Sequence, residues 1–177
     1  LLRIGDYNYA KDIIDRINNS DLFESRLIYR NVQTEAISYK INFCDLLHLT
    51  NSFQEAIDNL ELLLVTSTLS SEQLERCNYL ILHCKRHIGE NLKQVSREFK
   101  VLSNTSQDSY FKIRSLYSSF SIDMFQGKND IKESFEKMRN KIDSLNPNSE
   151  ILLFAQRHYI IFYRRICKDF KKAEKLL

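Results

Sequence analysis

The sequence predicts an all-α fold, an α-α superhelix (a solenoid) of about five helical hairpins. Two observations lead to this fold class. The 177 residues include only 3 glycines and 1 proline, too few backbone breakers for the many turns of a β-sandwich or a β-barrel. A pattern of small and large apolar residues also recurs with a step of about 39 residues, as a stack of similar helix pairs requires.

The recurring pattern consists of three columns that fall on one face of an α-helix. The central, small-residue column holds Ala56, Val95, Ser134 and Ala173, each 39 residues after the one before. Large apolar residues lie three positions before and four positions after each of them, and the same columns surround Ala10, 46 residues before Ala56. A small side chain lets a facing helix approach closely, so we expect this column to be buried between helices.

The columns mark the second helix of each pair, and the turn residues between them delimit the first helices. Second helices are expected to begin near residues 7, 53, 91, 130 and 169. First helices are expected over roughly 33–49, 71–88, 108–126 and 150–167. Ser70 and Gln73 form a capping-box pattern at one first-helix start. Gly5, Gly89 and Gly127 fall at helix-to-helix turns, where glycine tolerates a positive φ.

One short phrase carries a family resemblance. Residues 5–10 read Gly-Asp-Tyr-Asn-Tyr-Ala, residues 53–56 read Phe-Gln-Glu-Ala, and residues 170–173 read Phe-Lys-Lys-Ala. The phrase resembles the second helix of a tetratricopeptide repeat (TPR). The period of 39 is longer than that family's ~34, and two of the five repeats lack alanine at the small position. Other α-α solenoids of the HEAT type, whose periods overlap, are the alternative.

The resemblance implies that the first helices line a concave face that binds partners. A 39-residue step along these helices connects what we call the polar column, His48, His87, Gln126 and Arg165. In the same register three residues earlier lie Asp45, Cys84, Asp123 and Phe162. We expect the polar column, with Asp45 and Asp123, to contribute contacts to a groove for an extended peptide or a partner helix. Tyrosines at 79, 117, 159 and 163 would be its aromatic anchors, and a merely solvated face is the alternative.

We therefore expect a TPR-like scaffold or sensor arm of a larger regulatory protein that binds a protein or peptide and is not an enzyme. One alternative is a receptor domain for a small signalling peptide, since longer repeats of this kind look similar to those of bacterial regulators and signal-transducing ATPases. Another is single-stranded nucleic-acid binding by the basic C-terminal repeat, where cations interleave with Tyr159, Phe162 and Tyr163. A net charge of only +3 favours a protein over nucleic acid as the partner. A structural spacer is the remaining interpretation.

Histidines and cysteines on one predicted helix form a candidate metal site. His83 and His87 are four residues apart on one predicted helix and share a face, near Cys77 and Cys84, so a pair of them has the spacing to hold Zn²⁺. The two cysteines fall on the apolar stripe of that helix, and no second cluster supplies further ligands. We therefore expect neither a metal nor a cofactor, and the chain has no glycine-rich phosphate loop.

Bulk features set the remaining expectations. No run of about 18 apolar residues is present, so no membrane association is expected. The 4 cysteines lie within helical patterns, which predicts buried thiols and a reducing, cytoplasmic location. Residues 1–177 are expected to form a single helical-repeat region, an internal segment of a longer protein, because neither end carries a helix cap. The pattern does not specify an oligomeric state.

Overall fold

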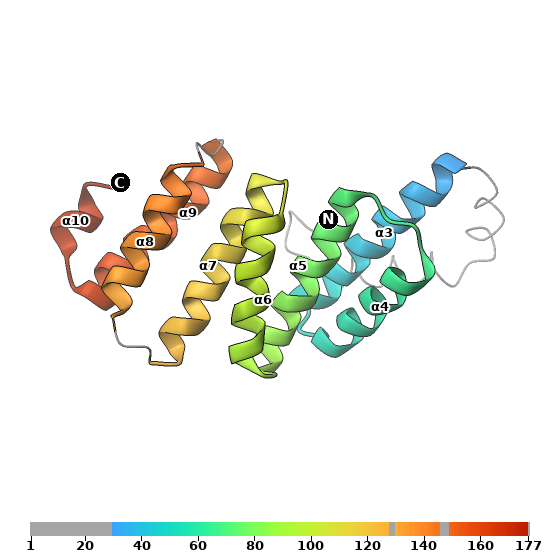
Figure 1. Ribbon diagram of the computed structural model, residues 1–177, viewed down its shortest axis with the longest axis horizontal. Helices are drawn as coiled ribbons and strands as arrows, with labels where there is room; N and C mark the ends of the chain where they lie inside the picture. Colours follow the sequence, from blue (N-terminus) through green and yellow to red (C-terminus); the bar gives the residue numbers. More distant parts are fainter. Residues whose placement is uncertain (1–29, 128–129, 146–148, 177) are drawn as a thin grey trace. The chain divides into compact units, whose positions relative to one another are not determined.

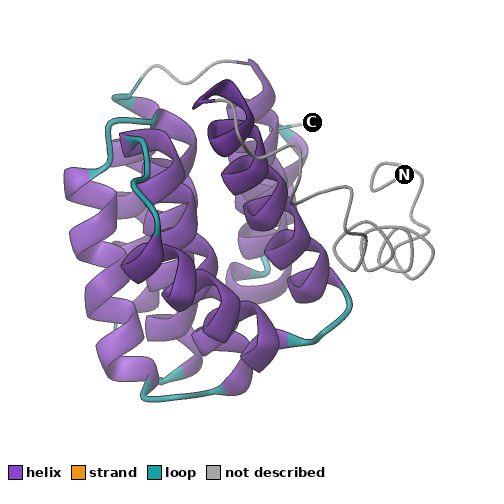
Figure 2. Ribbon diagram, turned by 90° about the vertical axis from the view of Figure 1, so that its right-hand side faces the viewer, coloured by secondary structure: helices purple, strands orange, loops and turns teal. Residues whose placement is uncertain are grey.

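The chain is described by a computed structural model that covers residues 30–127, 130–145 and 149–176. Within these residues the backbone forms α-helices, one π-helix and no strand (Figure 2). The helices are α3 (Arg30–Leu49), α4 (Phe53–Thr66), α5 (Ser71–Ile88), α6 (Leu92–Thr105), α7 (Ser109–Phe125), α8 (Ile131–Asp143), α9 (Ser149–Phe162), the π-helix η2 (Tyr163–Cys167) and α10 (Phe170–Glu174). The all-α prediction is therefore confirmed.

Two compact units divide the chain, Leu1–Leu92 and Lys93–Leu177, which we call the N-terminal unit and the C-terminal unit. In the N-terminal unit, α3, α4 and α5 pack against one another (Figure 1). In the C-terminal unit, α7 packs against α8 and α9, and α10 packs against α9 and η2. Consecutive helices thus pack in adjacent pairs, an arrangement compatible with a helical repeat.

Local sequence signals account for the helix boundaries. The hydroxyl of Ser70 accepts the backbone N–H of Gln73 at 3.2 Å, and the Gln73 side chain accepts the backbone N–H of Ser70 at 3.0 Å, so the predicted capping box is present. Gly89 and Gly127 have φ values of 82° and 69°, as expected where a first helix ends. Gly5 and the helix expected from residue 7 lie outside the described residues.

Aliphatic side chains and thiols fill the core of the N-terminal unit. Leu46 in α3 and Leu60 in α4 are fully buried, as are Cys44, Cys77 and Cys84. Burial of one leucine side chain contributes about 1.5–3 kcal/mol to folding. The three buried thiols behave as small apolar side chains, which need no polar partner.

Aromatic rings dominate the core of the C-terminal unit. Phe135 of α8 is fully buried, and its ring stacks on that of Phe162 with the centroids 3.7 Å apart and the planes 9° apart. The rings of Tyr159 and Tyr163 meet Phe135 edge-on at 5.6 and 5.3 Å. Phe120 of α7 lies 5.6 Å from the same ring. Phe135 therefore joins α7, α8 and α9 through stacked and edge-to-face contacts.

The small-residue column is buried at three of its four described positions. Ala56, Val95 and Ala173 are buried as predicted, but Ser134 is exposed, so the prediction is wrong at that position. The next residue, Phe135, is buried. A buried phenyl ring removes far more apolar surface from water than a serine side chain does, so the buried face of α8 includes Phe135 and leaves Ser134 in solvent. Ala10 lies outside the described residues.

The fourth of the first helices, α9, ends in a widened turn. After α9, residues Tyr163–Cys167 form the π-helix η2, and the backbone N–H of Asp169 donates to the carbonyl oxygen of Tyr163 at 2.9 Å. Lys168 follows in the left-handed region, with a φ of 55°. A π-turn holds one residue more than an α-turn, so the helical stretch still ends close to the predicted residue 167.

Among the described residues, every helix is too short or too polar to cross a membrane.

Candidate functional site

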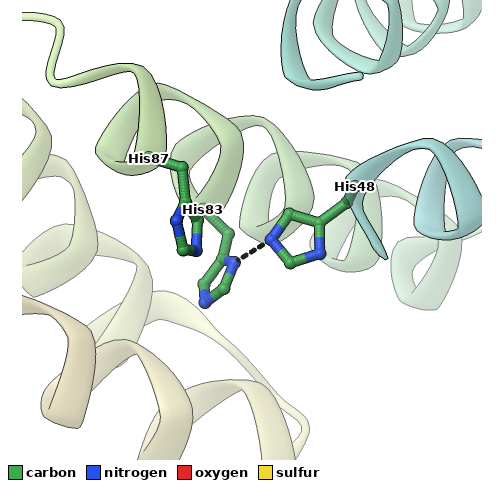
Figure 3. A group of neighbouring side chains, drawn as sticks. All are labelled: His48, His83 and His87. Atoms are coloured by element: carbon green, nitrogen blue, oxygen red, sulfur yellow. Dashed lines mark hydrogen bonds between the residues drawn. The ribbon is translucent and has the colours of Figure 1, made fainter. Parts of the chain in front are cut away.

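Three histidines from two helices meet in the N-terminal unit, and we call them the histidine group (His48, His83 and His87; Figure 3). His48 is the second-to-last residue of α3, and His83 and His87 are one turn apart at the end of α5. The Nδ1 atom of His83 and the Nε2 atom of His48 are 2.7 Å apart, a hydrogen-bond distance. One ring nitrogen from each histidine lies within 4.8 Å of the other two. The fold thus brings two members of the polar column together and adds His83.

Aromatic rings flank the histidine group. The ring of Phe53, the first residue of α4, stacks on His87 with the centroids 4.9 Å apart and the planes 7° apart. The buried Tyr79 ring lies 5.5 Å from that of His83. Burial, and secondarily the charge of Arg86, lowers the pKa of His87 below its ordinary value of 6.5. At pH 7 the His87 imidazole is therefore neutral, and it carries a nitrogen lone pair.

Asp45 lies one turn before His48 and connects α3 to α5. Its Oδ2 atom accepts a hydrogen bond from the Nη2 atom of Arg76 at 3.1 Å, and Arg76 also donates to the Oδ1 atom of Asn42 at 2.7 Å. Both charged side chains are partly exposed, so the pair contributes at most about 1 kcal/mol. The carboxylate is thus engaged within the unit, where it helps to hold the two first helices together.

Asp123 has the equivalent register position in α7, yet its partners come from α6. The hydroxyl of the buried Ser96 donates to the Oδ1 atom of Asp123 at 2.7 Å. The Nζ atom of Lys100 donates to the Oδ2 atom at 2.7 Å. The two aspartates that the register aligns therefore differ in structural role: Asp45 connects two first helices, whereas Asp123 connects a first helix to the second helix before it.

Gln126 and Arg165 lie at the first-helix ends of the C-terminal unit. Gln126 is the C-cap of α7, and its backbone N–H donates to the carbonyl oxygen of Ile122 at 3.0 Å. Arg165 lies within η2, and both side chains are exposed. Among the described residues, no direct contact joins the two. The polar column therefore occupies the C-terminal ends of the first helices, where unpaired backbone carbonyls favour cationic side chains.

Exposed apolar residues directly follow three members of the polar column, and we call them the apolar neighbours. They are Leu49, Ile88 and Ile166, with 43%, 45% and 44% of their surface exposed. The fourth position, after Gln126, is Gly127. A polar side chain followed by a half-exposed aliphatic one thus recurs at first-helix ends in both units, which the sequence pattern alone did not reveal.

The cysteines near the histidine group belong to the core. Burial raises the pKa of the Cys44 and Cys84 thiols to about 12 and that of the Cys77 thiol to about 11. A protonated thiol is neither a metal ligand nor a nucleophile at neutral pH. All four cysteines are free, and the prediction of buried thiols is confirmed for these three, whereas Cys167 is partly exposed.

The tyrosines expected as anchors are mostly core residues. Tyr79, Tyr159 and Tyr163 are buried, so the expectation that they contact a partner is wrong for these three. Their rings fill the cores, and the hydroxyl groups of Tyr159 and Tyr163 have local partners; the Tyr163 hydroxyl donates to the Oε1 atom of Glu136 at 2.7 Å. Only Tyr117, which is half-buried, keeps part of its ring accessible.

The basic C-terminal repeat exposes its cations but not its aromatic rings. The exposed cations are Arg157, Arg164, Arg165, Lys168, Lys171, Lys172 and Lys175. Tyr159, Phe162 and Tyr163 are buried, so they offer no ring face for stacking on a nucleobase. Lys172 also contacts the Oε1 atom of Glu136 at 3.1 Å. Of the two interactions expected for nucleic-acid binding, only the phosphate contacts remain.

Sequence reasoning placed His83 and His87 on one face but missed His48 as their neighbour. His48 and His83 are 35 residues apart, so they belong to different columns of the 39-residue register. Two signals were nevertheless present. His83 and His87 have helical spacing, and His48 lies one full repeat before His87. If successive first helices pack side by side, a histidine at the end of one must lie near the end of the next.

Comparisons with protein-family models, with curated proteins and with solved structures found no match. The proposals below therefore rest on the paired helices, the polar column and the histidine group.

Proposed function

We propose that the chain is a segment of a TPR-like helical-repeat protein, a scaffold or sensor arm of a larger regulatory protein, that binds a protein or peptide partner through its first helices. The observation that carries this proposal is the recurrence of the apolar neighbours beside the polar column. Half-exposed aliphatic side chains next to polar ones resemble the mixed character of recognition surfaces. The proposal includes no catalytic step.

The spacing of the second helices supports the repeat. They begin at Phe53, Leu92, Ile131 and Phe170, and each start lies 39 residues after the one before. A helical hairpin cannot bury its apolar face alone, so a fixed spacing of similar helices is what stacking of such hairpins requires. By the same logic the first helices of each unit lie on one face of that unit, which is why we place the partner there.

Peptide selection tests the proposed function. A phage-displayed peptide library is panned against the chain, and the affinities of the enriched peptides are measured by fluorescence anisotropy. Ile88→Asp and Ile166→Asp are expected to weaken binding about tenfold or more, because a carboxylate replaces apolar contact area. Val65→Asp is the matched control, since Val65 is 86% exposed on a second helix and should not contact the partner.

Circular dichroism checks that each variant remains folded. Failure to enrich any peptide would reject the proposal, as would a Val65→Asp variant that loses as much affinity as Ile88→Asp. A short signalling peptide is one form of the proposed partner, and it would be recognised in this experiment by a minimal binding length of a few residues.

Single-stranded nucleic acid is the second candidate partner, favoured by the exposed cations of the C-terminal repeat. Without ring stacking, the expected binding depends on phosphate contacts alone and therefore weakens steeply with salt. The measurement is the anisotropy of labelled RNA and DNA oligonucleotides at about 50 and about 200 mM salt. Lys171→Glu should lower any such affinity, and the absence of binding at the lower salt concentration removes this candidate.

A further inference from the structure

The histidine group has a feature that partner binding does not explain. Two ring nitrogens, Nδ1 of His83 and Nε2 of His48, face each other at 2.7 Å. Their lone pairs would repel one another, so a proton or a metal cation must lie between them. A nitrogen of His87 completes a triangle in which every ligand atom is within 4.8 Å of the others (Figure 3). From this convergence we propose that the histidine group binds Zn²⁺ or a similar divalent transition-metal ion.

The ligand geometry suits a tetrahedral ion. Zn–N bonds of about 2.0–2.1 Å place tetrahedral nitrogen ligands about 3.3 Å apart. The separation between His83 and His48, 2.7 Å, lies below this value, and the limit of 4.8 Å lies above it. Small rotations of the imidazole rings would therefore equalise the three distances. His83 and His87, four residues apart on α5, supply two ligands from one helix face, and His48 supplies the third from α3.

The surroundings admit a cation. His48 and His83 are half-buried and His87 is exposed, so an ion can enter from solvent. His48 and His87 each lie next to the end of a helix, where the partial negative charge of the helix C-terminus attracts cations. The charge of Arg86 acts in the opposite direction. The stacked Phe53 ring holds His87 in place and excludes water from one side of it.

The donor set selects the type of metal. The three ligands are imidazoles, which suit zinc, copper, nickel and iron, whereas magnesium and calcium prefer oxygen ligands. The neighbouring thiols of Cys77 and Cys84 are fully buried and protonated, so they do not compete for the ion. With three protein ligands, a tetrahedral ion keeps a fourth position for water.

The predicted consequence is a clamp between two successive first helices. The ion would join the end of α3 to the end of α5 within the N-terminal unit, at the same first-helix ends where the polar column lies. This metal site is independent of the proposed function, because it concerns the binding of an ion and not of a peptide or protein.

Metal titration of the full chain tests the proposal. After treatment with a chelator, the protein is titrated with Zn²⁺ in a calorimeter, and Co²⁺ is added to a second sample to record its absorption spectrum. We expect one Zn²⁺ ion per chain and a cobalt spectrum of a tetrahedral site without a thiolate-to-metal charge-transfer band. His87→Ala should weaken zinc binding about 100-fold or more, because a ligand matters at least as much as the residues that orient it.

Matched variants separate the site from general histidine effects. His158→Ala removes the remaining histidine of the chain, which lies on α9 and contacts the carbonyl oxygen of Phe154 at 2.7 Å, and it should leave zinc affinity unchanged. His83→Ala should act like His87→Ala; if it unfolds, the exposed His87 variant still decides the outcome. The proposal is overturned by the absence of saturable zinc binding, by full affinity in His87→Ala, or by a thiolate band. A stoichiometry of one ion per two chains would overturn the intrachain clamp.

Discussion

The two units build similar helix pairs around different side chains. In the N-terminal unit, leucines and three thiols fill the core, and the polar groups that connect helices are the histidine group and the Asp45–Arg76 pair. In the C-terminal unit, the stacked rings around Phe135 fill the core, and an acidic side chain, Glu136, joins Tyr163 and Lys172. Similar helix pairs can therefore be held together by different side-chain chemistry.

The largest expected difference concerns the aromatic core. Phe135→Ala should lower the free energy of unfolding by about 3–5 kcal/mol, because one ring supports four aromatic neighbours from three other helices, α7, α9 and η2. Leu60→Ala in the N-terminal unit should cost about 2–5 kcal/mol, and we expect it in the lower half of that range. Urea unfolding measures both. Phe125→Ala, at an exposed position of α7, is the control and should stay within about 0.5 kcal/mol. A smaller loss in Phe135→Ala than in Leu60→Ala would reverse the comparison.

Zinc should act on one unit only. If the histidine group binds the ion, a hundredfold excess of zinc over its dissociation constant stabilises the folded N-terminal unit by about 2.7 kcal/mol. Amide hydrogen exchange should then slow in α3 and α5 and stay unchanged in α9. Equal slowing in α9 would show that zinc acts elsewhere than at the histidine group.

Alkaline pH should reveal the thiol core. The thiols of Cys44, Cys77 and Cys84 keep their protons in the folded state because their pKa values are raised from 9.0 to about 12, 11 and 12. Above pH 9 the unfolded chain therefore binds fewer protons than the folded one, and stability falls as the pH rises. Each thiol contributes a slope of about 1.4 kcal/mol per pH unit. Urea unfolding between pH 9 and pH 11 measures it.

A variant that lacks one thiol is the control for this pH dependence. Cys84→Ala should remove about one third of the fall, since one of three thiols is gone. Burial also raises the pKa of Tyr159 in the C-terminal unit, but its contribution begins only near its ordinary value of 10.0. An unchanged slope in Cys84→Ala would assign the alkaline loss to groups other than the thiols.

A smaller effect should follow from the polar contacts of the C-terminal unit. Tyr163→Phe keeps the ring against Phe135 but removes the hydroxyl that donates to Glu136 at 2.7 Å and accepts from Arg139 at 3.0 Å. We expect a loss of about 1 kcal/mol at pH 7. Burial raises the pKa of Glu136, but the hydrogen bonds from Tyr163 and Lys172 outweigh it, and the net pKa is lowered.

The pH profile distinguishes this contact from simple packing. Ionised Glu136 contributes stability above its ordinary pKa of 4.5, and that contribution is lost as the pH falls. In Tyr163→Phe, the difference in stability from the wild type should therefore shrink on acidification from pH 7 to pH 4. A difference that stays constant with pH would indicate that only ring packing has changed.

The sequence predicts local features of this structure, such as helix ends, better than features that depend on packing between helices. Helix ends were predictable because caps and turns are local: Ser70, Gly89 and Gly127 each act within a few residues. Which of two adjacent residues is buried was not, since the exposed Ser134 and the buried Phe135 are neighbours in sequence. For the histidine group, the sequence indicated only His83 and His87 as neighbours. The contact of His48 with α5 depends on how the two helices pack, which no local signal specifies.

The smallest expected effect tests the exposure of Ser134. Ser134→Ala should change stability by no more than about 0.5 kcal/mol, in the stabilising direction, because the site is exposed and alanine favours the helix. Ala56→Ser at the equivalent register position should cost about 1 kcal/mol, since it places a hydroxyl in the core. Thermal unfolding of both variants compares them. Equal losses would mean that both residues face a core.

The widened turn of η2 has a consequence for the length of the repeat. A π-turn is what an α-helix becomes when it takes in one additional residue without moving the residues on either side. Deleting a single residue between Tyr163 and Cys167 would restore an ordinary helix there and leave Phe162 and Phe170 with their present neighbours. This turn can therefore gain or lose a single residue during evolution while the helices on either side of it keep their contacts.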